Sequence, residues 1–254
     1  PSSEILETIS KYRHDGVYIE WSVNEKAAME VAAAAAYSGA RAMVTMKQVG
    51  LNVAADPLMS LAYVGVKGGM VIVSADDPGP ISSQTEQDTR RFADFCRIPV
   101  FDPSSPEEAY KMIGDAFEYS EKYNTPVLFR PTTRVCHAYA SIDNCDSPSP
   151  KKYEGFVKDS KKWVIFPRLS FANHIMIEKR NVEIGKDFST YSANKAEGVN
   201  SEKAVVTSGI SYAYTKECLK DYPNVKLIKI ATAYPFPEDF VLSSLEGAKE
   251  VLCI

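Results

Sequence analysis

Short, wholly apolar runs alternate with amphipathic stretches along the first half of the chain. Residues 70–73 and 127–129 are continuous apolar runs, which is typical of strands buried on both faces of a sheet. Between them, residues 84–95 and 106–122 predict helices, the second of them opened by an N-cap serine and a proline. Strands that alternate with helices predict right-handed crossovers and an α/β fold, with a mostly parallel sheet flanked by helices.

One strand–helix–strand unit near the amino terminus organises this predicted fold. A strand at residues 16–19 leads into an alanine-rich helix, which begins after the N-cap Asn24 and ends before Gly39. A second strand follows at residues 41–46, and the polar segment 47–52 comes directly after it. Ligands of open α/β sheets bind beyond the carboxyl ends of the strands, so this segment is a candidate pocket wall.

Glu25 lies in the first turn of the alanine-rich helix. An acidic residue in that position is commonly no more than a favourable partner of the helix dipole. Alternatively, the alanine-rich wall, with Trp21, Val23 and Met29 nearby in sequence, removes the carboxylate from water and makes it a catalytic group. The dipole lowers the carboxylate pKa and desolvation raises it, and the residue pattern leaves both interpretations open.

The composition changes after residue 142. The beginning of the segment 143–200 is rich in Ser, Pro, Asp and Lys, which predicts a boundary. We therefore expect a first domain over residues 1–142 and a linker over 143–200 that packs on both domains. Three further strands with intervening helices predict a second, smaller α/β domain over residues 201–254.

Bulk composition excludes several classes of protein. The chain has 254 residues, 45% of them hydrophobic and 24% charged, and its net charge of −4 gives no reason to expect nucleic-acid binding. No apolar run reaches membrane-spanning length, and no signal-peptide pattern is visible, so we expect a cytoplasmic protein. The five cysteines form no Cys-x-x-Cys pair and the three histidines are isolated, so we expect reduced thiols and no metal site in this segment.

Several long strings resemble one family in the same order. They are EWSVNEKAAMEVAAAAAYSGARAMVTMKQVGLNVAADPLM, GGMVIVSADDPGPISSQTEQDTRRFA and PVLFRPTTRVCHA. These are similar to the pyrimidine-binding domain of the thiamine diphosphate-dependent 2-oxoacid:ferredoxin oxidoreductases, above all to large (alpha) subunits of the indolepyruvate ferredoxin oxidoreductases. The later strings VVTSGISYAYTKECL and ATAYPFPEDF resemble the transketolase carboxyl-terminal-like domain of the same family. By this resemblance the chain is expected to be truncated at both ends.

The resemblance assigns roles to residues at the strand ends. It implies that Glu25 bonds N1′ of the cofactor's aminopyrimidine, as both a catalytic and a cofactor-binding residue. Gln48, Val49 and Asn52, in the turn after the second strand, are further candidate cofactor-binding residues because of their place at a strand end. Lys47, Asp76 and Asp77, which directly follow two predicted strands, are candidate substrate-binding residues. A solvated strand end remains the alternative for Lys47 and Gln48, and a turn cap the alternative for the two aspartates.

One requirement of thiamine diphosphate is missing from the chain. The Gly-Asp-Gly motif with a downstream asparagine, which holds Mg²⁺ and the diphosphate, does not occur, and Gly114-Asp115 falls inside a predicted helix. The resemblance therefore implies that the diphosphate-binding domain and a ferredoxin-like domain with iron–sulfur clusters lie elsewhere in the enzyme. It also implies a small beta subunit, ferredoxin and coenzyme A as partners, and a homodimer of the large chain.

The substrate class follows from one difference within the family. Pyruvate-specific relatives carry an arginine near the place where this chain has Asp76-Asp77, which favours an aryl 2-oxo acid such as indolepyruvate. The implied reaction is oxidative decarboxylation to an acyl-CoA, with electrons passed to ferredoxin. An enzyme for pyruvate or a branched-chain 2-oxo acid is one alternative, and a non-catalytic α/β scaffold or assembly subunit is another.

Overall fold

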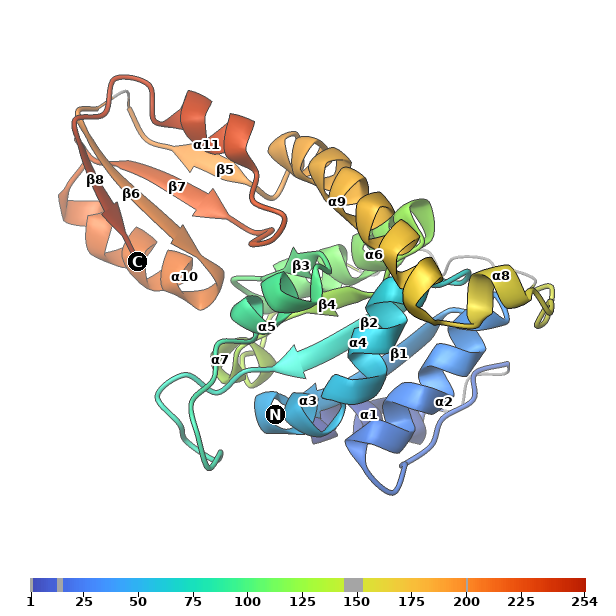
Figure 1. Ribbon diagram of the computed structural model, residues 1–254. Helices are drawn as coiled ribbons and strands as arrows, with labels where there is room; N and C mark the ends of the chain where they lie inside the picture. Colours follow the sequence, from blue (N-terminus) through green and yellow to red (C-terminus); the bar gives the residue numbers. More distant parts are fainter. Residues whose placement is uncertain (1, 13–15, 144–152, 200) are drawn as a thin grey trace.

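The structure, a computed structural model, describes residues 2–12, 16–143, 153–199 and 201–254. Its strands form two four-stranded sheets that lie in separate parts of the molecule (Figure 1). Among the described residues, no helix is both long enough and apolar enough to cross a membrane.

The first sheet is entirely parallel. Its strands are β1 (Ala42–Lys47), β2 (Met70–Ala75), β3 (Val100–Phe101) and β4 (Val127–Phe129), in the order β1-β2-β4-β3. Every residue of β2 is buried, which confirms the continuous apolar run as a strand covered on both faces. The strand predicted at residues 16–19 is wrong. Val17 and Tyr18 are more than half exposed and no residue there pairs with the edge strand β1, so the segment gains no ladder bonds.

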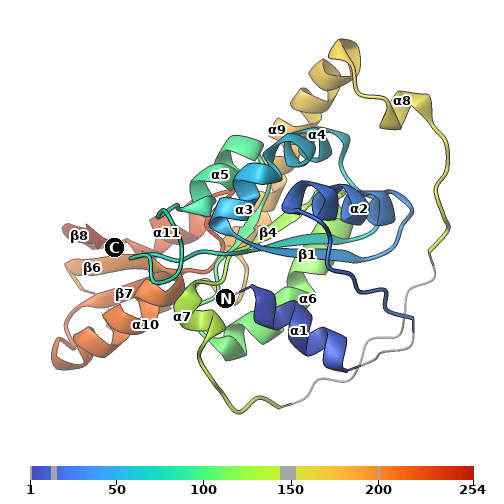
Figure 2. The ribbon, with the colours of Figure 1, turned by 90° about the horizontal axis from the view of Figure 1, so that it is seen from below.

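Helices cover both faces of this sheet (Figure 2). One face carries α2 (Glu25–Tyr37), α3 (Gln48–Val53), α4 (Ala55–Val64) and α5 (Thr89–Cys96), and the other carries α1 (Ser3–Lys11) and α6 (Pro106–Tyr123). The helix α2 begins at the predicted cap, because the Asn24 side chain accepts a hydrogen bond from Ala27 N at 2.9 Å. Its small alanines allow close packing, and Ala33 and Ala36 belong to the core of this face.

The predictions of the two other helices in this domain agree with the structure to different extents. The helix α6 matches its prediction, and the Ser105 hydroxyl accepts from Glu108 N as an N-cap. The Glu108 carboxylate, however, accepts from Ser104 N rather than from the cap residue itself. The helix α5 begins at Thr89 instead of residue 84, because Asp88 is its cap and residues 78–88 form a loop.

The segment predicted as a linker contains the longest helix of the described chain. It holds α8 (Ser160–Trp163) and α9 (Pro167–Ser189), and α9 contacts both α4 and α11 (Glu238–Ser244). The sequence pattern concealed α9 because two buried positions are polar. Asn173 donates to Tyr63 O at 2.9 Å, and Asn181 donates to Arg97 O at 3.3 Å.

The second sheet contains the three strands expected from the sequence and one that was not. β6 (Lys203–Ser208), β7 (Lys226–Ile230) and β8 (Glu250–Cys253) are parallel, while the short β5 (Lys195–Glu197) pairs antiparallel with β7. The connecting segments are α10 (Gly209–Cys218), η1 (Leu219–Asp221) and α11. A fragment of three residues has too little apolar periodicity to be recognised in the sequence.

Candidate active site

Glu25 lies against the backbone of Gly50. A Cβ atom built on Gly50 would be 2.7 Å from Glu25 Oε1, so only a glycine allows the carboxylate this position. Gly50 belongs to α3 (Gln48–Val53), the short helix that follows β1. Glu25 therefore lies at the carboxyl ends of the strands of the parallel sheet. The side chain is half-buried, and it makes no hydrogen bond or ion pair with any residue in the part of the chain that the structure describes. A carboxylate in this position is free to bond a ligand.

The residues predicted beside Glu25 point in different directions. Gln48 is fully buried, its Nε2 donates to Thr85 O at 3.1 Å, and its Oε1 has no partner among the described residues. Lys47 donates to the backbone and hydroxyl oxygens of Ser82, at 3.0 and 3.1 Å. Val49 is half-buried, and Asn52 faces solvent. Lys47 and Gln48 therefore both hold the loop 78–88 over this edge of the sheet.

Asp76 anchors the far end of the same loop. Its carboxylate accepts from Thr89 N at 2.9 Å and from Thr89 Oγ1 at 2.8 Å, and Arg130 Nε donates to it at 2.8 Å. The residue is completely buried. The carboxylate that the sequence suggests as a substrate contact is thus occupied by donors of the protein.

Asp77 anchors the near end of the loop. Its Oδ2 accepts from the backbone N–H groups of Ile81 and Ser82, and its Oδ1 accepts from Thr133 Oγ1. Burial alone would raise the pKa of Asp77, but these hydrogen bonds stabilise the charged form and lower the pKa to about 2. Asp77 is therefore charged at neutral pH and accepts the hydrogen bonds that hold the turn, as expected for the turn-cap alternative.

Sequence reasoning missed a buried charge network next to these aspartates. Arg130 lies 3.4 Å from Asp102 as well as 2.8 Å from Asp76, and Arg90 also reaches Asp102 at 3.4 Å. Burial would lower the pKa of Arg130, but the charges of Asp102 and Asp76 outweigh it and raise the pKa, so the guanidinium stays charged. A charged residue directly after a buried apolar strand was the available signal, since Asp102 follows β3 and Arg130 follows β4.

The network reaches the second sheet. Arg90 donates to the Ser208 hydroxyl at the end of β6, and a Cβ on Gly209 would be 2.6 Å from Asp102 Oδ1. Gly209 also has a φ of +50°, a conformation in which other residues are strained. The carboxyl ends of the parallel strands of both sheets therefore lie close together, with Asp102 between them.

The described residues offer no obvious site for a metal ion. They contain no cluster of three or more His, Cys, Asp or Glu side chains placed to hold one. Cys96, Cys136, Cys218 and Cys253 are free thiols, while Cys145 and His14 lie outside the described residues. Burial raises the pKa of Cys96 to about 12 and that of Cys136 to about 11, so neither is a thiolate at neutral pH.

A match to a family model shows the family of the chain. Residues 1–202 match the family described as pyruvate flavodoxin/ferredoxin oxidoreductase, thiamine diphosphate-binding. The whole chain is 40% identical to the indolepyruvate oxidoreductase subunit IorA of Pyrococcus horikoshii and 41% identical to that of Methanothermobacter thermautotrophicus. It spans only 41% and 42% of the lengths of these two relatives. A 2-oxoglutarate synthase subunit KorA of Methanocaldococcus jannaschii is 23% identical, over 99% of this chain and 80% of that relative.

A solved structure shares the fold over the whole chain. The 2-oxoglutarate:ferredoxin oxidoreductase from Magnetococcus marinus, solved with 2-oxoglutarate, coenzyme A and succinyl-CoA bound, superposes with a TM-score of 0.74. The match covers 100% of this chain and 52% of that one, at 17% sequence identity. At this identity the likeness supports the α/β architecture and not the roles of individual residues.

Proposed function

The chain belongs to the pyruvate flavodoxin/ferredoxin oxidoreductase family, in its thiamine diphosphate-binding part, and on this premise we propose that it forms the pyrimidine-binding portion of an indolepyruvate ferredoxin oxidoreductase. The complete enzyme would oxidatively decarboxylate an aryl 2-oxo acid to an acyl-CoA and pass the electrons to ferredoxin. The observation that carries this proposal is the unpaired, half-buried Glu25 carboxylate held against Gly50 at the carboxyl edge of the sheet.

The described residues suit the aminopyrimidine half of thiamine diphosphate. That ring presents a nitrogen that bonds a carboxylic acid and an amino group that bonds an acceptor. Glu25 supplies an unpaired carboxylate, and Gln48 Oε1 is a buried acceptor without a partner in the described part of the chain. Val49 and Asn52, from the same helix α3, are the other residues we propose for the cofactor.

Glu25 has one chemical task in this arrangement. Thiamine diphosphate, when bound, supplies the electron sink that decarboxylation of a 2-oxo acid requires. Glu25 would hold a proton at its carboxylate within hydrogen-bonding range of the ring nitrogen and exchange that proton during the reaction. The contact with Gly50 limits the positions that the carboxylate can take, which would reduce the reorganisation needed when the proton moves.

The same residues do not suit the charged half of the cofactor. No metal-ligand cluster occurs among the described residues, and the sequence lacks a Gly-Asp-Gly motif. We therefore propose that Mg²⁺ and the diphosphate bind to a separate domain, and that iron–sulfur clusters lie in a further ferredoxin-like domain. The enzyme would be completed by a small beta subunit, coenzyme A and a second copy of the large chain. We also propose a cytoplasmic location, which the four free cysteines among the described residues support.

The substrate contacts proposed for Lys47, Asp76 and Asp77 remain a prediction. All three side chains hold the loop 78–88 or its ends, which supports an effect on the substrate through the shape of that loop. The domain boundaries at residues 142 and 200 are likewise proposals. The segment between them packs on both α4 and α11, which supports a connection that touches both domains.

One variant tests the proposal in the complete enzyme. Glu25→Gln should lower ferredoxin-dependent oxidation of indolepyruvate by about 10² to 10⁴-fold, because an amide cannot exchange the proton. Glu30→Gln, which alters an exposed glutamate of the same helix, is the matched control and should keep full activity. Activity of Glu25→Gln within a few-fold of wild type would instead support the scaffold alternative. Turnover of pyruvate or of a branched-chain 2-oxo acid faster than indolepyruvate would support the same-class alternative.

A further inference from the structure

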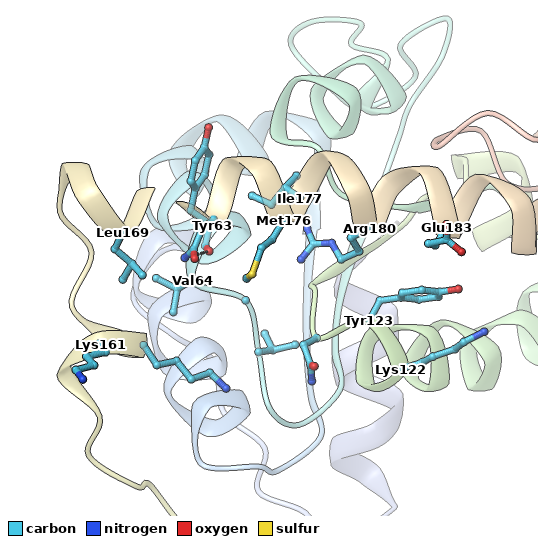
Figure 3. A pocket seen from close by; sticks show the side chains of 15 residues that line it. Tyr63, Val64, Lys122, Tyr123, Lys161, Leu169, Met176, Ile177, Arg180 and Glu183 are labelled. Carbon is cyan, nitrogen blue, oxygen red and sulfur yellow. Dashed lines mark hydrogen bonds between the residues drawn. The ribbon is translucent and has the colours of Figure 1, made fainter. Parts of the chain in front are cut away.

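A cavity of about 540 Å³ lies beyond the amino ends of the strands of the first sheet, whereas Glu25 lies beyond their carboxyl ends. Gly65 and Val66 line it just before β2, and Asn124 lines it shortly before β4, so the cavity lies at the amino ends of the strands. The helix α9 forms another wall and directs Met176 and Arg180 toward the space (Figure 3). This cavity is therefore separate from the candidate active site.

The lining combines apolar surface with positive charge. The apolar side chains are Val64, Val66, Leu169, Met176 and Ile177. The charged side chains are four cations and one carboxylate, namely Lys122, Lys161, Lys162, Arg180 and Glu183. The protein as a whole has a net charge of −4, but this cavity is lined by more cations than anions. The local positive potential therefore attracts anions to the cavity.

Arg180 is the lining cation that combines partial burial with the lack of a partner among the described residues. Its Nε and Nη2 atoms are buried and have no hydrogen-bond partner among the residues that the structure describes. Burial lowers the pKa of Arg180 to about 10, and the guanidinium is still charged at neutral pH. A charge that is partly withdrawn from water and has no partner is unfavourable, so an anion beside Arg180 would offset part of that cost.

The neighbouring charges leave this place open to an anion. Glu183 pairs with Lys186 at 3.1 Å, and Lys122 pairs with Asp187. Lys162 lies over the Trp163 ring, with its nitrogen 4.5 Å from the ring centre. In the described part of the chain, neither Lys161 nor Lys162 forms a side-chain salt bridge, so both add to the positive field near the cavity.

We propose that this cavity binds a small organic anion, whose carboxylate or phosphate group pairs with Arg180 and whose apolar part packs on Val64, Leu169 and Met176. Arg180 lines the cavity, and its charged guanidinium would donate a hydrogen bond to either group. Lys161 and Lys162 lie on α8 and would strengthen binding through charge. The proposal does not depend on the reaction at Glu25, because the two places lie at opposite edges of the sheet.

Calorimetric titration of the full-length chain with its partner subunit tests the proposal. The probes are hexanoate, which has both features, inorganic phosphate, which has only the charge, and hexanamide, which has no charge. Hexanoate should bind saturably at one site, and Arg180→Met should weaken it at least tenfold, as expected for the loss of a charged hydrogen bond. Lys179→Met removes an exposed lysine next to Arg180 and should leave binding unchanged.

A thermal scan separates lost binding from lost folding. Arg180→Met removes an unpaired buried charge, so its unfolding midpoint without added anion should equal or exceed that of wild type. Hexanoate should raise the midpoint of wild type and of Lys179→Met but not that of Arg180→Met. Three results would overturn the proposal: no saturable binding of hexanoate or phosphate up to about 10 mM, equal binding by Arg180→Met, or a crystal structure in which a carboxylate of the protein itself fills the cavity and pairs with Arg180.

Discussion

The Glu25 carboxylate and the backbone of Gly50 are in direct contact, with Oε1 only 2.7 Å from the place of an absent Cβ. The contact joins the first turn of α2 to the short helix α3 at the end of β1. A glycine in the middle of a helix is normally unfavourable by about 0.5–1 kcal/mol relative to alanine. Here the glycine leaves room for the Glu25 carboxylate, at some cost in helix stability.

Gly50→Ala should therefore separate activity from stability. The new methyl group would displace the flexible end of Glu25 rather than backbone, and alanine favours the helix, so the free energy of unfolding should change by less than about 1 kcal/mol. Activity with indolepyruvate should fall at least tenfold, because the carboxylate leaves its fixed position. Gly114→Ala is the matched control: its Cβ would meet nothing within 4 Å, and activity should be retained. Full activity of Gly50→Ala would show that this contact has no catalytic importance.

Asp77 should make the free energy of unfolding depend measurably on pH in the acid range. Its pKa is lowered from 3.8 to about 2 in the folded state, so its contribution is fully present above the unfolded pKa and is lost as the pH falls through the folded pKa. The shift corresponds to about 2 kcal/mol at neutral pH, falling to about half of that near pH 3. Urea unfolding of wild type and Asp77→Asn should show a difference that narrows between pH 6 and pH 3. A difference that is constant with pH would mean that the charge is unimportant.

Arg130→Met should be among the most damaging substitutions in the chain. It would leave the fully buried carboxylates of Asp76 and Asp102 without this guanidinium, and breaking a buried ion pair costs about 3–5 kcal/mol. Denaturant unfolding would measure this loss, and Arg134→Met, at an exposed arginine in α7 (Thr133–Cys136), should lose less than about 0.5 kcal/mol. Equal stability of the two variants would show that Asp76 and Asp102 find other partners.

The sequence predicted the parallel architecture well because strands buried on both faces leave continuous apolar runs, as in β2. It placed Glu25 at the strand-end edge, but the contact with Gly50 joins residues 25 positions apart and no local pattern records it. The roles of Asp76 and Asp77 depend on donors from Thr89, Arg130 and Thr133, which are distant in sequence. The sequence therefore showed that polar residues follow the strands. Which of their side chains remain without a hydrogen-bond partner depends on tertiary contacts with residues far away in the sequence.

Phe188 tests whether α9 belongs to the core of the first sheet rather than to a loose linker. Its ring is fully buried and meets the rings of Phe101 and Tyr119 at centroid distances of 5.4 and 5.2 Å. Phe188→Ala should destabilise the protein by about 3–5 kcal/mol, because it removes a large apolar side chain and leaves a cavity. Phe171→Ala, on the same helix but with Phe171 72% exposed, should lose far less. Chemical denaturation followed at two probes, one in each sheet, would measure both variants. A small loss for Phe188→Ala would place α9 outside the cooperative core, whereas a large loss seen by both probes would mean that this helix couples the unfolding of the two sheets.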